Sequence, residues 1–204
     1  MTMNLQFFGG RGGSASRNNP KEIGDYESAT EYFSKEVDKW QKSLTDQELE
    51  ALVQYTNGEE GTFESINNYL WSGGENYYAD DIKALDKAIS KFNLNEDIVV
   101  YRGTEGADFD LSKGSIITQK GFTSTSTSFE TAESYVNSVE SEWMEKPTVL
   151  KITVPKGKGR AAFVANTATF VPEESEVLLK RNSKLKITGT QKVNGRTVVT
   201  ATMI

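Results

Sequence analysis

The chain of 204 residues contains no cysteine and no histidine, and each absence removes a class of chemistry. Without cysteine there is no disulfide, no zinc–thiolate centre and no thiol nucleophile. Without histidine, Ser-His-Asp and Cys-His catalysis are excluded, and so is any imidazole general base. A catalytic site in this chain must therefore be built from carboxylates, hydroxyls, lysine or arginine.

Long apolar runs and an excess of positive charge are also missing. No apolar run approaches the ~20 residues that a membrane-spanning helix needs, so no membrane partner is expected. The net charge of −6 argues against nucleic acid as a partner, because such binding relies on basic patches. Residues 5–8 are too short an apolar stretch for a secretory signal. The predicted location is the cytoplasm, a virion, or a target cell reached by a separate route.

The length suits one domain with its own core, preceded by a tail. Residues 1–20 are rich in Gly, Ser and Asn and are predicted to be a flexible tail. Residues 21–204 are predicted to form a single domain, helical over 21–94 and β-rich over 95–204. The first helix is indicated by apolar residues spaced by three and four, namely Tyr26, Ala29, Phe33, Val37 and Trp40.

Three further helices are predicted in the helical part. Thr45 followed by Glu48 is a capping-box pattern that begins the second helix, and Asn57-Gly58 ends it. Its inward residues are expected to be Leu49, Leu52, Val53 and Tyr55. The third helix is predicted over 63–71 and the fourth over 78–92, with Ile82, Leu85 and Ile89 facing inward.

From residue 95 the apolar spacing changes to that of strands. Strands are predicted over 98–102, 149–154, 161–164, 177–179, 184–188 and 196–203, and 115–117 is expected to pair with 121–124. Asn194-Gly195 is typical of a hairpin turn. A helix is predicted over 129–139, with Ala132, Tyr135 and Val139 on one face. Helices first and strands later indicate an α+β fold.

Three stretches place unusual polar residues at predicted strand ends, and each has an ordinary interpretation as well as a functional one. Arg102, between Tyr101 and Gly103, is either a solvated edge residue or a fixed cation for phosphate or carboxylate. In the second interpretation Gly103 lets a ligand approach the backbone.

The other two stretches are a row of hydroxyls and a group of carboxylates. In Phe122-Thr123-Ser124-Thr125-Ser126, Ser124 and Ser126 would share one strand face. This is either a polar strand leading to a helix cap or a row of hydroxyls that holds a charged partner. Glu174 and Glu176 would likewise project from one face at the entrance to strand 177–179. They form either a solvated acidic turn or a pair of close carboxylates that some function requires.

In this order the motifs resemble those of the ADP-ribosyltransferases of the arginine, Ser-Thr-Ser, glutamate class. This class includes the enzymatic components of clostridial binary toxins and related insecticidal toxins, and the resemblance covers roughly residues 40–190. It implies an α+β ADP-ribosyltransferase fold, with a helical N-terminal flank on two packed, mainly antiparallel sheets and NAD in the cleft between them. The diphtheria-toxin-like branch has a histidine in place of Arg102, and this chain contains none.

The resemblance also implies roles for individual residues. Arg102 would bind a phosphate of NAD, and the Gly103 backbone would hold the nicotinamide carboxamide. Ser124 would orient Glu176, which would bind the nicotinamide ribose and stabilise the positive charge that develops as the glycosidic bond breaks. Asn67 would reach the cofactor from its helix, and Phe122 belongs to the same cofactor-binding set.

Glu174 would hold the acceptor and help to deprotonate it, and in this family the first glutamate of Glu-x-Glu goes with arginine as acceptor. Phe170 resembles the aromatic residue that helps to recognise the target. The implied reaction transfers ADP-ribose from NAD, as substrate and without a metal, to an arginine of a target protein. The alternatives are an NAD glycohydrolase, with water as acceptor, and a non-catalytic virion-associated module.

Residues 4–12 supply a separate resemblance, to the start of head-associated proteins of bacteriophages and prophages of Gram-positive bacteria. This resemblance implies a phage- or prophage-encoded transferase whose partner is a virion protein or a host bacterial protein.

Overall fold

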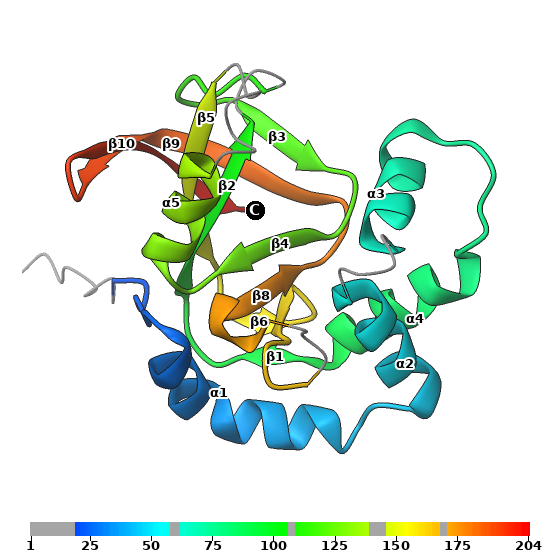
Figure 1. Cartoon of the computed structure of the whole chain (residues 1–204). Coiled ribbons are helices and arrows are strands. Elements are labelled where there is room, and N and C mark those ends of the chain that lie inside the picture. Colours follow the sequence, from blue (N-terminus) through cyan, green and yellow to red (C-terminus); the bar gives the residue numbers. More distant parts are fainter. Residues whose placement is uncertain (1–18, 58–61, 106–108, 139–145, 168–170) are drawn as a thin grey trace, which may run out of the picture.

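The computed structural model of the whole chain describes residues 19–57, 62–105, 109–138, 146–167 and 171–204 (Figure 1). The helices are α1 (Tyr26–Gln41), α2 (Asp46–Thr56), α3 (Thr62–Ser72), α4 (Ala79–Lys91) and α5 (Phe129–Asn137), and η3 (Pro172–Glu174) is a short 3-10 helix. The strands are β1 (Asn93–Leu94), β2 (Ile98–Glu105), β3 (Ile116–Gln119), β4 (Thr123–Ser126), β5 (Pro147–Val154), β6 (Gly157–Lys158), β7 (Ala161–Phe163), β8 (Glu176–Leu179), β9 (Ser183–Val193) and β10 (Arg196–Met203).

The predicted apolar stripe of the first helix lies in α1 and is buried except at Tyr26, which is half-buried. Asp25 caps the helix, because its Oδ1 accepts a hydrogen bond from the backbone N–H of Ser28 at 3.0 Å. Near the other end, Trp40 Nε1 donates a hydrogen bond to the carbonyl of Ala88 in α4 at 2.7 Å. The apolar spacing therefore predicted both the helix and the face that it buries.

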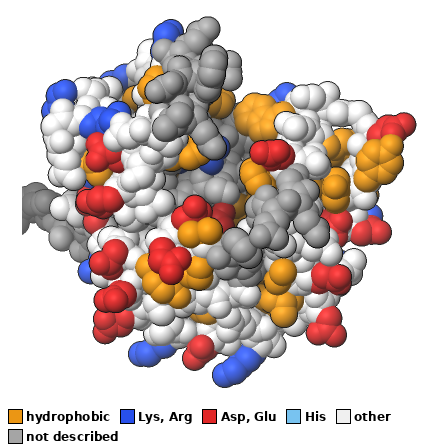
Figure 2. All heavy atoms as spheres, viewed as in Figure 1, with side chains coloured by type: hydrophobic (Ala, Val, Ile, Leu, Met, Phe, Trp, Pro, Cys, Tyr) orange, Lys and Arg blue, Asp and Glu red, His pale blue; other side chains and the backbone are white. Residues whose placement is uncertain are grey.

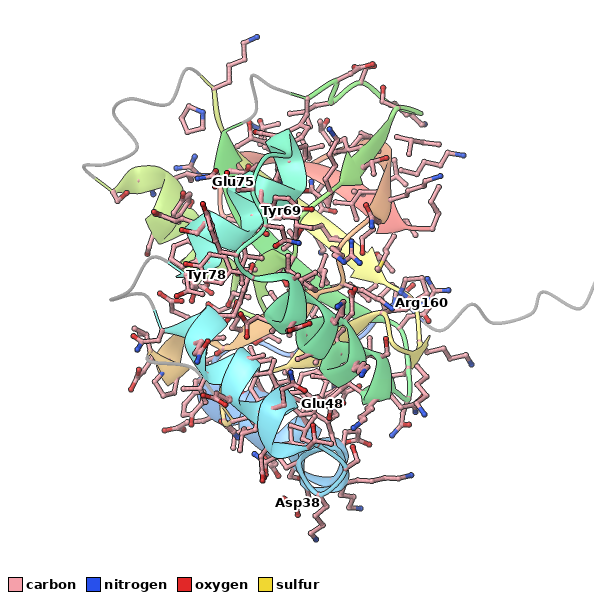
Figure 3. The ribbon with its side chains drawn as sticks, turned by 90° about the vertical axis from the view of Figure 1, so that its right-hand side faces the viewer. Asp38, Glu48, Tyr69, Glu75, Tyr78 and Arg160 are labelled. Carbon is pink, nitrogen blue, oxygen red and sulfur yellow. The ribbon has the colours of Figure 1, made fainter. Side chains whose placement is uncertain are left out.

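The predicted capping box of α2 is confirmed, since Thr45 and Glu48 each bond the other's backbone N–H. The predicted inward face is partly wrong. Leu49 and Val53 are 41% and 43% exposed, and the buried side runs through Leu52 and Tyr55. This side faces α3 and α4, and Figure 3 shows the three helices side by side with α1 below them. The packing of α2 against α3 and α4 therefore decides which of its apolar residues are buried.

The main sheet has eight strands in the order β3-β9-β10-β5-β2-β4-β8-β7, and β1 pairs with β6 in a separate two-stranded ladder. Adjacent strands of the eight-stranded sheet are antiparallel, except that β5 and β10 are parallel. The α+β class and the mainly antiparallel pairing are confirmed. The expected pair of packed sheets is replaced by one sheet with a narrow point of connection.

That connection lies between β2 and β4. These strands pair in register at one position, Tyr101 opposite Ser126, whereas β2 pairs with β5 along its whole length from Ile98 to Glu105. One half of the sheet therefore contains β3, β9, β10, β5 and β2, and the other contains β4, β8 and β7. The two halves remain connected while their strands diverge beyond the single pair.

Two strand predictions are corrected by the pairing. The segments 115–117 and 121–124 were expected to pair, but β3 pairs with β9, and β4 lies between β2 and β8. The backbone of Gly121 is not in the left-handed region that a two-residue hairpin turn requires, so the chain passes from one half of the sheet to the other. Strand β2 also continues past Gly103, where the prediction ended it.

Helix α5 covers the sheet beside the connection, and it buries a different stripe from the predicted one. Phe129, Ala132 and Val136 are buried in a small core with residues of β2, β5 and β10. Tyr135 is 54% exposed, and Val139 lies outside the described residues. The larger core joins the helices α1 to α4 to the sheet, and it includes the other buried residues of β2, β5 and β10.

The chain ends of the fold are fixed by backbone pairing. Lys21 bonds to Asp97 and Val99 through its backbone N–H and carbonyl, at 2.7 and 2.9 Å. The predicted hairpin turn at Asn194 and Gly195 is confirmed: both have positive φ, 48° and 84°, and β9 and β10 pair directly on either side.

Among the described residues, no helix has the length and apolarity needed to cross a membrane.

Candidate active site

The site begins where β2 and β4 diverge. Arg102 directly follows Tyr101, whose partner across the connection is Ser126. The half-buried Arg102 side chain extends to the neighbouring strand, where its Nη1 donates a hydrogen bond to the carbonyl of Ser124 at 2.6 Å. Burial lowers the pKa of Arg102, while Tyr55, Tyr135 and Glu176 act in the opposite direction. The guanidinium is therefore a cation fixed at the point where the sheet opens.

Glu176 stands beside this cation as the first residue of β8, opposite Ser126 in the ladder. Its side chain is 8% exposed. Burial raises the pKa of Glu176 to about 7, the nearby charge of Glu174 adds to the increase, and a hydrogen bond from Ser124 and the charge of Arg102 oppose it. Ser124 and Glu176 are therefore close enough to interact, and the predicted role of Ser124 in orienting Glu176 stays a prediction.

The sequence predicted that Glu174 and Glu176 share one strand face. In the structure Glu174 is close to Glu176 but does not share a strand face with it. It ends η3, and Ser175 then adopts the left-handed conformation, with φ 52° and ψ 45°, before β8 begins. The assumption that residues i and i+2 of one strand face the same way fails here, because the strand starts at Glu176. The Glu174 side chain remains exposed, and partial loss of solvent raises its pKa.

The hydroxyl row of β4 holds this turn in place. Ser126 Oγ donates to the carbonyl of Glu174 at 2.6 Å and accepts from the backbone N–H of Ser128 at 2.9 Å. The backbone N–H of Thr127 donates to the carbonyl of Ser175 at 3.3 Å. Ser126 therefore holds the backbone of the Glu174–Glu176 segment, whereas the functional interpretation of the hydroxyl row had expected it to bond a charged group. Ser128 also caps α5, which was the ordinary interpretation.

A second group of polar side chains connects the helices to β4. The buried Tyr55 hydroxyl donates to the carbonyl of Phe122 at 3.4 Å and accepts from Asn67 Nδ2 at 2.9 Å. It also hydrogen-bonds the Ser124 side chain. The Oδ1 atom of Asn67 is buried and has no hydrogen-bond partner among the described residues. Tyr55 thus joins the predicted cofactor residue Asn67 to the strand that carries Ser124.

Sequence reasoning placed Tyr55 only as a lining residue of its helix. A tyrosine at a core-facing helical position gives no sign of where its hydroxyl lies, because that depends on the packing of α2 against β4. Gly121 was also missed as a close-packing residue. A Cβ atom at this position would collide with the side-chain amide of Asn67, so glycine is needed for α3 to approach the start of β4.

Two of the predicted cofactor residues have clear packing roles. A Cβ at Gly103 would lie 2.5 Å from the carbonyl oxygen of Ala132, so close contact with α5 already requires glycine there. The Phe122 ring is 3% exposed and packs edge-on against Tyr55, with 5.6 Å between ring centroids. Phe170 and residues 4–12 lie outside the described residues. Glu173 is exposed.

The face that carries β4, η3 and β8 has acidic side chains spread across it (Figure 2), in keeping with the net charge. In the described part of the chain, no group of three or more acidic, His or Cys residues is arranged to hold a metal ion. The fixed guanidinium of Arg102 can bind an anionic substrate. The carboxyl groups of Glu176 and Glu174, with the hydroxyls of β4 beside them, can stabilise positive charge next to that substrate.

Residues 29–204 match the family described as ADP-ribosyltransferase exoenzyme. The chain belongs to this family. NAD(+)–arginine ADP-ribosyltransferase EFV of Enterococcus faecalis is 33% identical to this exoenzyme-family chain over 156 residues, which cover 74% of the chain and 30% of that protein. The chain therefore spans less than a third of the length of this curated relative.

Solved structures of other proteins share the fold. Plx2a, an ADP-ribosyltransferase toxin from Paenibacillus larvae, is 27% identical, with a TM-score of 0.71 over 91% of this chain and 100% of the Plx2a chain. C3stau2 from S. aureus, solved with NAD, is 18% identical, with a TM-score of 0.72 over 91% of this chain and 99% of the other. The fold of this exoenzyme-family member is that of an ADP-ribosyltransferase.

Proposed function

We propose that this chain transfers ADP-ribose from NAD to an arginine side chain of a target protein and releases nicotinamide. Family membership supports ADP-ribosyl transfer, and the name of the 33% identical relative supports NAD and arginine as substrates. The structural observation that carries the proposal is the buried Glu176 carboxyl. Ser124 of β4 is its hydrogen-bonding neighbour, and Arg102 is fixed to the backbone of Ser124.

The residues present fit NAD as a substrate. Arg102 supplies a fixed cation for a phosphate of the pyrophosphate, and its planar guanidinium suits that group. In this proposal Asn67 reaches the cofactor from α3; its Oδ1 is buried beside Gly121 without a hydrogen-bond partner among the described residues. In this proposal the Gly103 backbone holds the nicotinamide carboxamide.

The proposed reaction breaks the bond between the ribose carbon and the nicotinamide nitrogen, and its electron pair leaves with nicotinamide. The ribose then carries developing positive charge, which the Glu176 carboxylate stabilises from its buried position. A guanidino nitrogen of the target arginine forms the new bond to the ribose carbon, and Glu174 takes the proton. The roles of the two glutamates therefore differ.

This difference gives the test of the proposal. Glu174→Gln should abolish transfer to protein or to the arginine mimic agmatine while sparing much of the NAD hydrolysis, and Glu176→Gln should abolish both. Both variants keep nearly the same side-chain volume, so each serves as the packing control for the other. Transfer and nicotinamide release are followed in the same reaction by chromatography.

Two outcomes would contradict the proposal. Nicotinamide release by the wild-type chain, with no transfer to agmatine or to any lysate protein, would favour an NAD glycohydrolase. If the wild-type chain releases no nicotinamide and millimolar NAD fails to raise its melting temperature, the non-catalytic module is favoured, because a ligand that binds the native state must stabilise it.

A further inference from the structure

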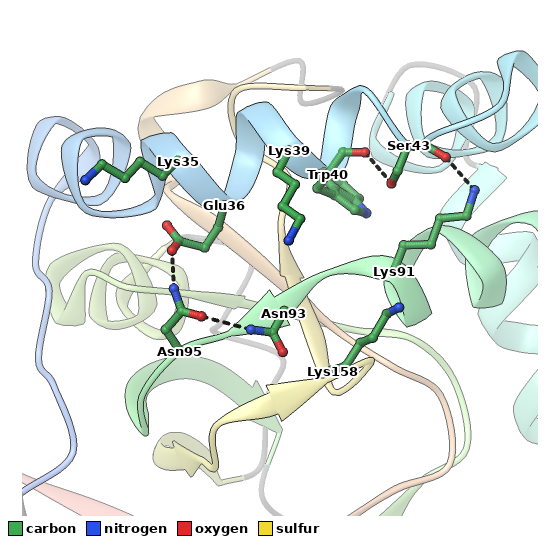
Figure 4. A pocket seen from close by; sticks show the side chains of 9 residues that line it. All are labelled: Lys35, Glu36, Lys39, Trp40, Ser43, Lys91, Asn93, Asn95 and Lys158. Atoms are coloured by element: carbon green, nitrogen blue, oxygen red, sulfur yellow. Dashed lines mark hydrogen bonds between the residues drawn. The ribbon is translucent and has the colours of Figure 1, made fainter.

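A lysine-rich hollow lies away from the candidate active site. Its volume is about 580 Å³, and its walls are α1, the end of α4 and the ladder of β1 and β6 (Figure 4). This volume falls within the range of small-molecule sites. Its lysines, Lys35, Lys39, Lys91 and Lys158, define what we call the lysine hollow.

The backbone brings these lysines together from three separate elements. Lys35 and Lys39 are four residues apart on α1, so they lie on the same side of that helix. Lys158 stands directly opposite Asn93 in the β1–β6 ladder, and Lys91 is in the last turn of α4. In Figure 4, Lys39 and Lys158 extend into the hollow from opposite walls. The convergence therefore follows from the fold and does not come from a run of lysines in the sequence.

Most of this positive charge is not neutralised. Lys91 is the exception, because its Nζ donates to Glu48 and to the carbonyl of Ser43, at 2.5 and 2.7 Å. Glu36 is the acidic residue among those that line the hollow, and its carboxylate accepts a hydrogen bond from the side chain of Asn95.

The other three lysines, Lys35, Lys39 and Lys158, have no carboxylate partner within the described ranges of the chain. A cluster of unpaired cations is unexpected in a chain with a net charge of −6. Like charges gathered around one hollow repel each other, and an anion placed between them would lower that repulsion.

We propose that the lysine hollow binds a polyanion that carries two or more phosphate groups. The lysine ammonium is a point charge and a good phosphate ligand. The hollow is larger than a single phosphate requires, and its unpaired lysines lie on opposite walls. It shares no residue with the site of Arg102, Ser124 and Glu176, so the proposal does not depend on NAD chemistry.

The test uses the full chain and inorganic tripolyphosphate, at low ionic strength, with binding followed by calorimetry and by melting temperature. The wild-type chain should bind the anion, and its melting temperature should rise with anion concentration. Lys39→Gln together with Lys158→Gln should raise the Kd by about tenfold or more, because two charge-assisted contacts are lost. Both lysines are exposed, so the double variant should fold normally.

A matched control neutralises two exposed lysines of β9, Lys184→Gln with Lys186→Gln. This pair makes the same charge change elsewhere and should leave the Kd unchanged. Equal weakening in the two double variants would overturn the proposal, since binding would then be a diffuse charge effect. Loss of binding in Arg102→Ala, with binding retained in the hollow variant, would also overturn it, because the anion would then occupy the active site.

Two further arms identify the source of the phosphates. One replaces tripolyphosphate by ATP, and the other uses phosphatidylcholine vesicles with and without phosphatidylinositol 4,5-bisphosphate. Binding to ATP that depends on Lys39 and Lys158 supports a soluble ligand, and vesicle binding with the same dependence supports a lipid headgroup. Failure of tripolyphosphate, ATP and vesicles to bind the wild-type chain would show that the lysine hollow is only a solvated face.

Discussion

The Glu176 carboxyl is buried, which favours its neutral form, whereas the proposed chemistry uses its charged form. At the scale of a single residue, this conflict is the main feature of the site. This carboxyl is taken out of solvent at the start of β8, so its pKa rises to about 7 even though Ser124 and Arg102 favour the ionised form. The proposed chemistry uses the carboxylate. Near neutral pH the free protein is thus divided between a protonated form and a competent ionised form.

We therefore predict that kcat/KM for NAD rises with pH through an apparent pKa near 7, because deprotonation of Glu176 supplies the active form. Activity should fall about tenfold per pH unit well below that value. A pH–rate profile from pH 5 to 9, with agmatine as acceptor, measures this. A flat profile over that range would show that ionisation of Glu176 does not limit the reaction.

A second residue-scale prediction concerns Tyr55, which we interpret as a positioning residue. Its hydroxyl contacts Asn67, Ser124 and the Phe122 carbonyl, so Tyr55→Phe should leave Asn67 and Ser124 less well oriented. We expect the KM for NAD to rise several-fold, with a stability loss of about 1 kcal/mol. Because Ser124 supports the ionised form of Glu176, the apparent pKa of the pH–rate profile should also rise.

A purely structural role for the Tyr55 hydroxyl would lower the melting temperature and leave both KM and the apparent pKa unchanged. Thr56→Ser at the next position of α2 makes a small change on the same helix and serves as a control for general loosening.

Much of the residue-level site was predictable, because Arg102, Ser124 and Glu176 stand in ordered motifs that resemble a known class. The structure then brings Arg102 to Ser124 and Ser124 to Glu176. Tyr55 could not be found in this way, since its hydroxyl becomes relevant only when α2 packs beside β4. Sequence pattern alone does not distinguish a buried tyrosine that supports a site from one that fills a core.

At the scale of elements, two glycines allow helices to approach the strands that carry the site. Gly103 in β2 touches α5, and Gly121 before β4 touches α3. The contacts differ in kind. At Gly103 the nearest atom is the backbone oxygen of Ala132, which cannot move without shifting α5, whereas at Gly121 it is the end of the Asn67 side chain.

We predict that alanine at these two positions has different consequences. Gly103→Ala should destabilise the protein by about 1–3 kcal/mol, because a rigid backbone contact is overpacked. Gly121→Ala should cost less stability but raise the KM for NAD, because the added methyl group displaces Asn67. Melting temperatures and KM values of the two variants measure this, and each variant is the control for the other. Equal stability losses with unchanged KM values would contradict the assignment.

The turn between η3 and β8 shows why element boundaries were harder to predict than element types. The sequence indicated a turn at Glu174 and Glu176 before a strand over 177–179, and a turn and a strand are both present. The left-handed Ser175 between them has no sequence signal, since such a conformation is typical of glycine or asparagine. The Ser126 and Thr127 contacts that hold the turn come from a strand about fifty residues earlier in the chain.

At the scale of the whole molecule, the order of helices and strands followed from apolar spacing, but the order of strands in the sheet did not. The parallel pairing of β5 with β10 and the pairing of β3 with β9 join segments far apart in sequence. Local spacing shows which faces are apolar and does not show which strands become neighbours. The narrow connection at Tyr101 and Ser126 is likewise a property of the assembled sheet.

The pairing of Lys21 with the start of β2 leads to a prediction about the N-terminal segment. Because the sequence predicts that residues 1–20 are a flexible tail, deletion of residues 1–18 should leave both the melting temperature and the kcat/KM for NAD unchanged. Calorimetry and the agmatine assay compare the two chains. Lys21→Pro in the shortened chain removes a backbone donor and should lower the melting temperature. A clear drop on deletion alone would show that the fold extends into residues 1–18.

The central claim is transfer of ADP-ribose from NAD to arginine, and one measurement tests it most directly. The wild-type chain and Glu176→Gln are each incubated with labelled NAD and agmatine, and labelled agmatine and free nicotinamide are quantified together. The account predicts that the wild-type chain forms ADP-ribosyl-agmatine with release of nicotinamide, and that Glu176→Gln forms neither. Nicotinamide release without labelled agmatine, or equal product from both chains, would contradict it.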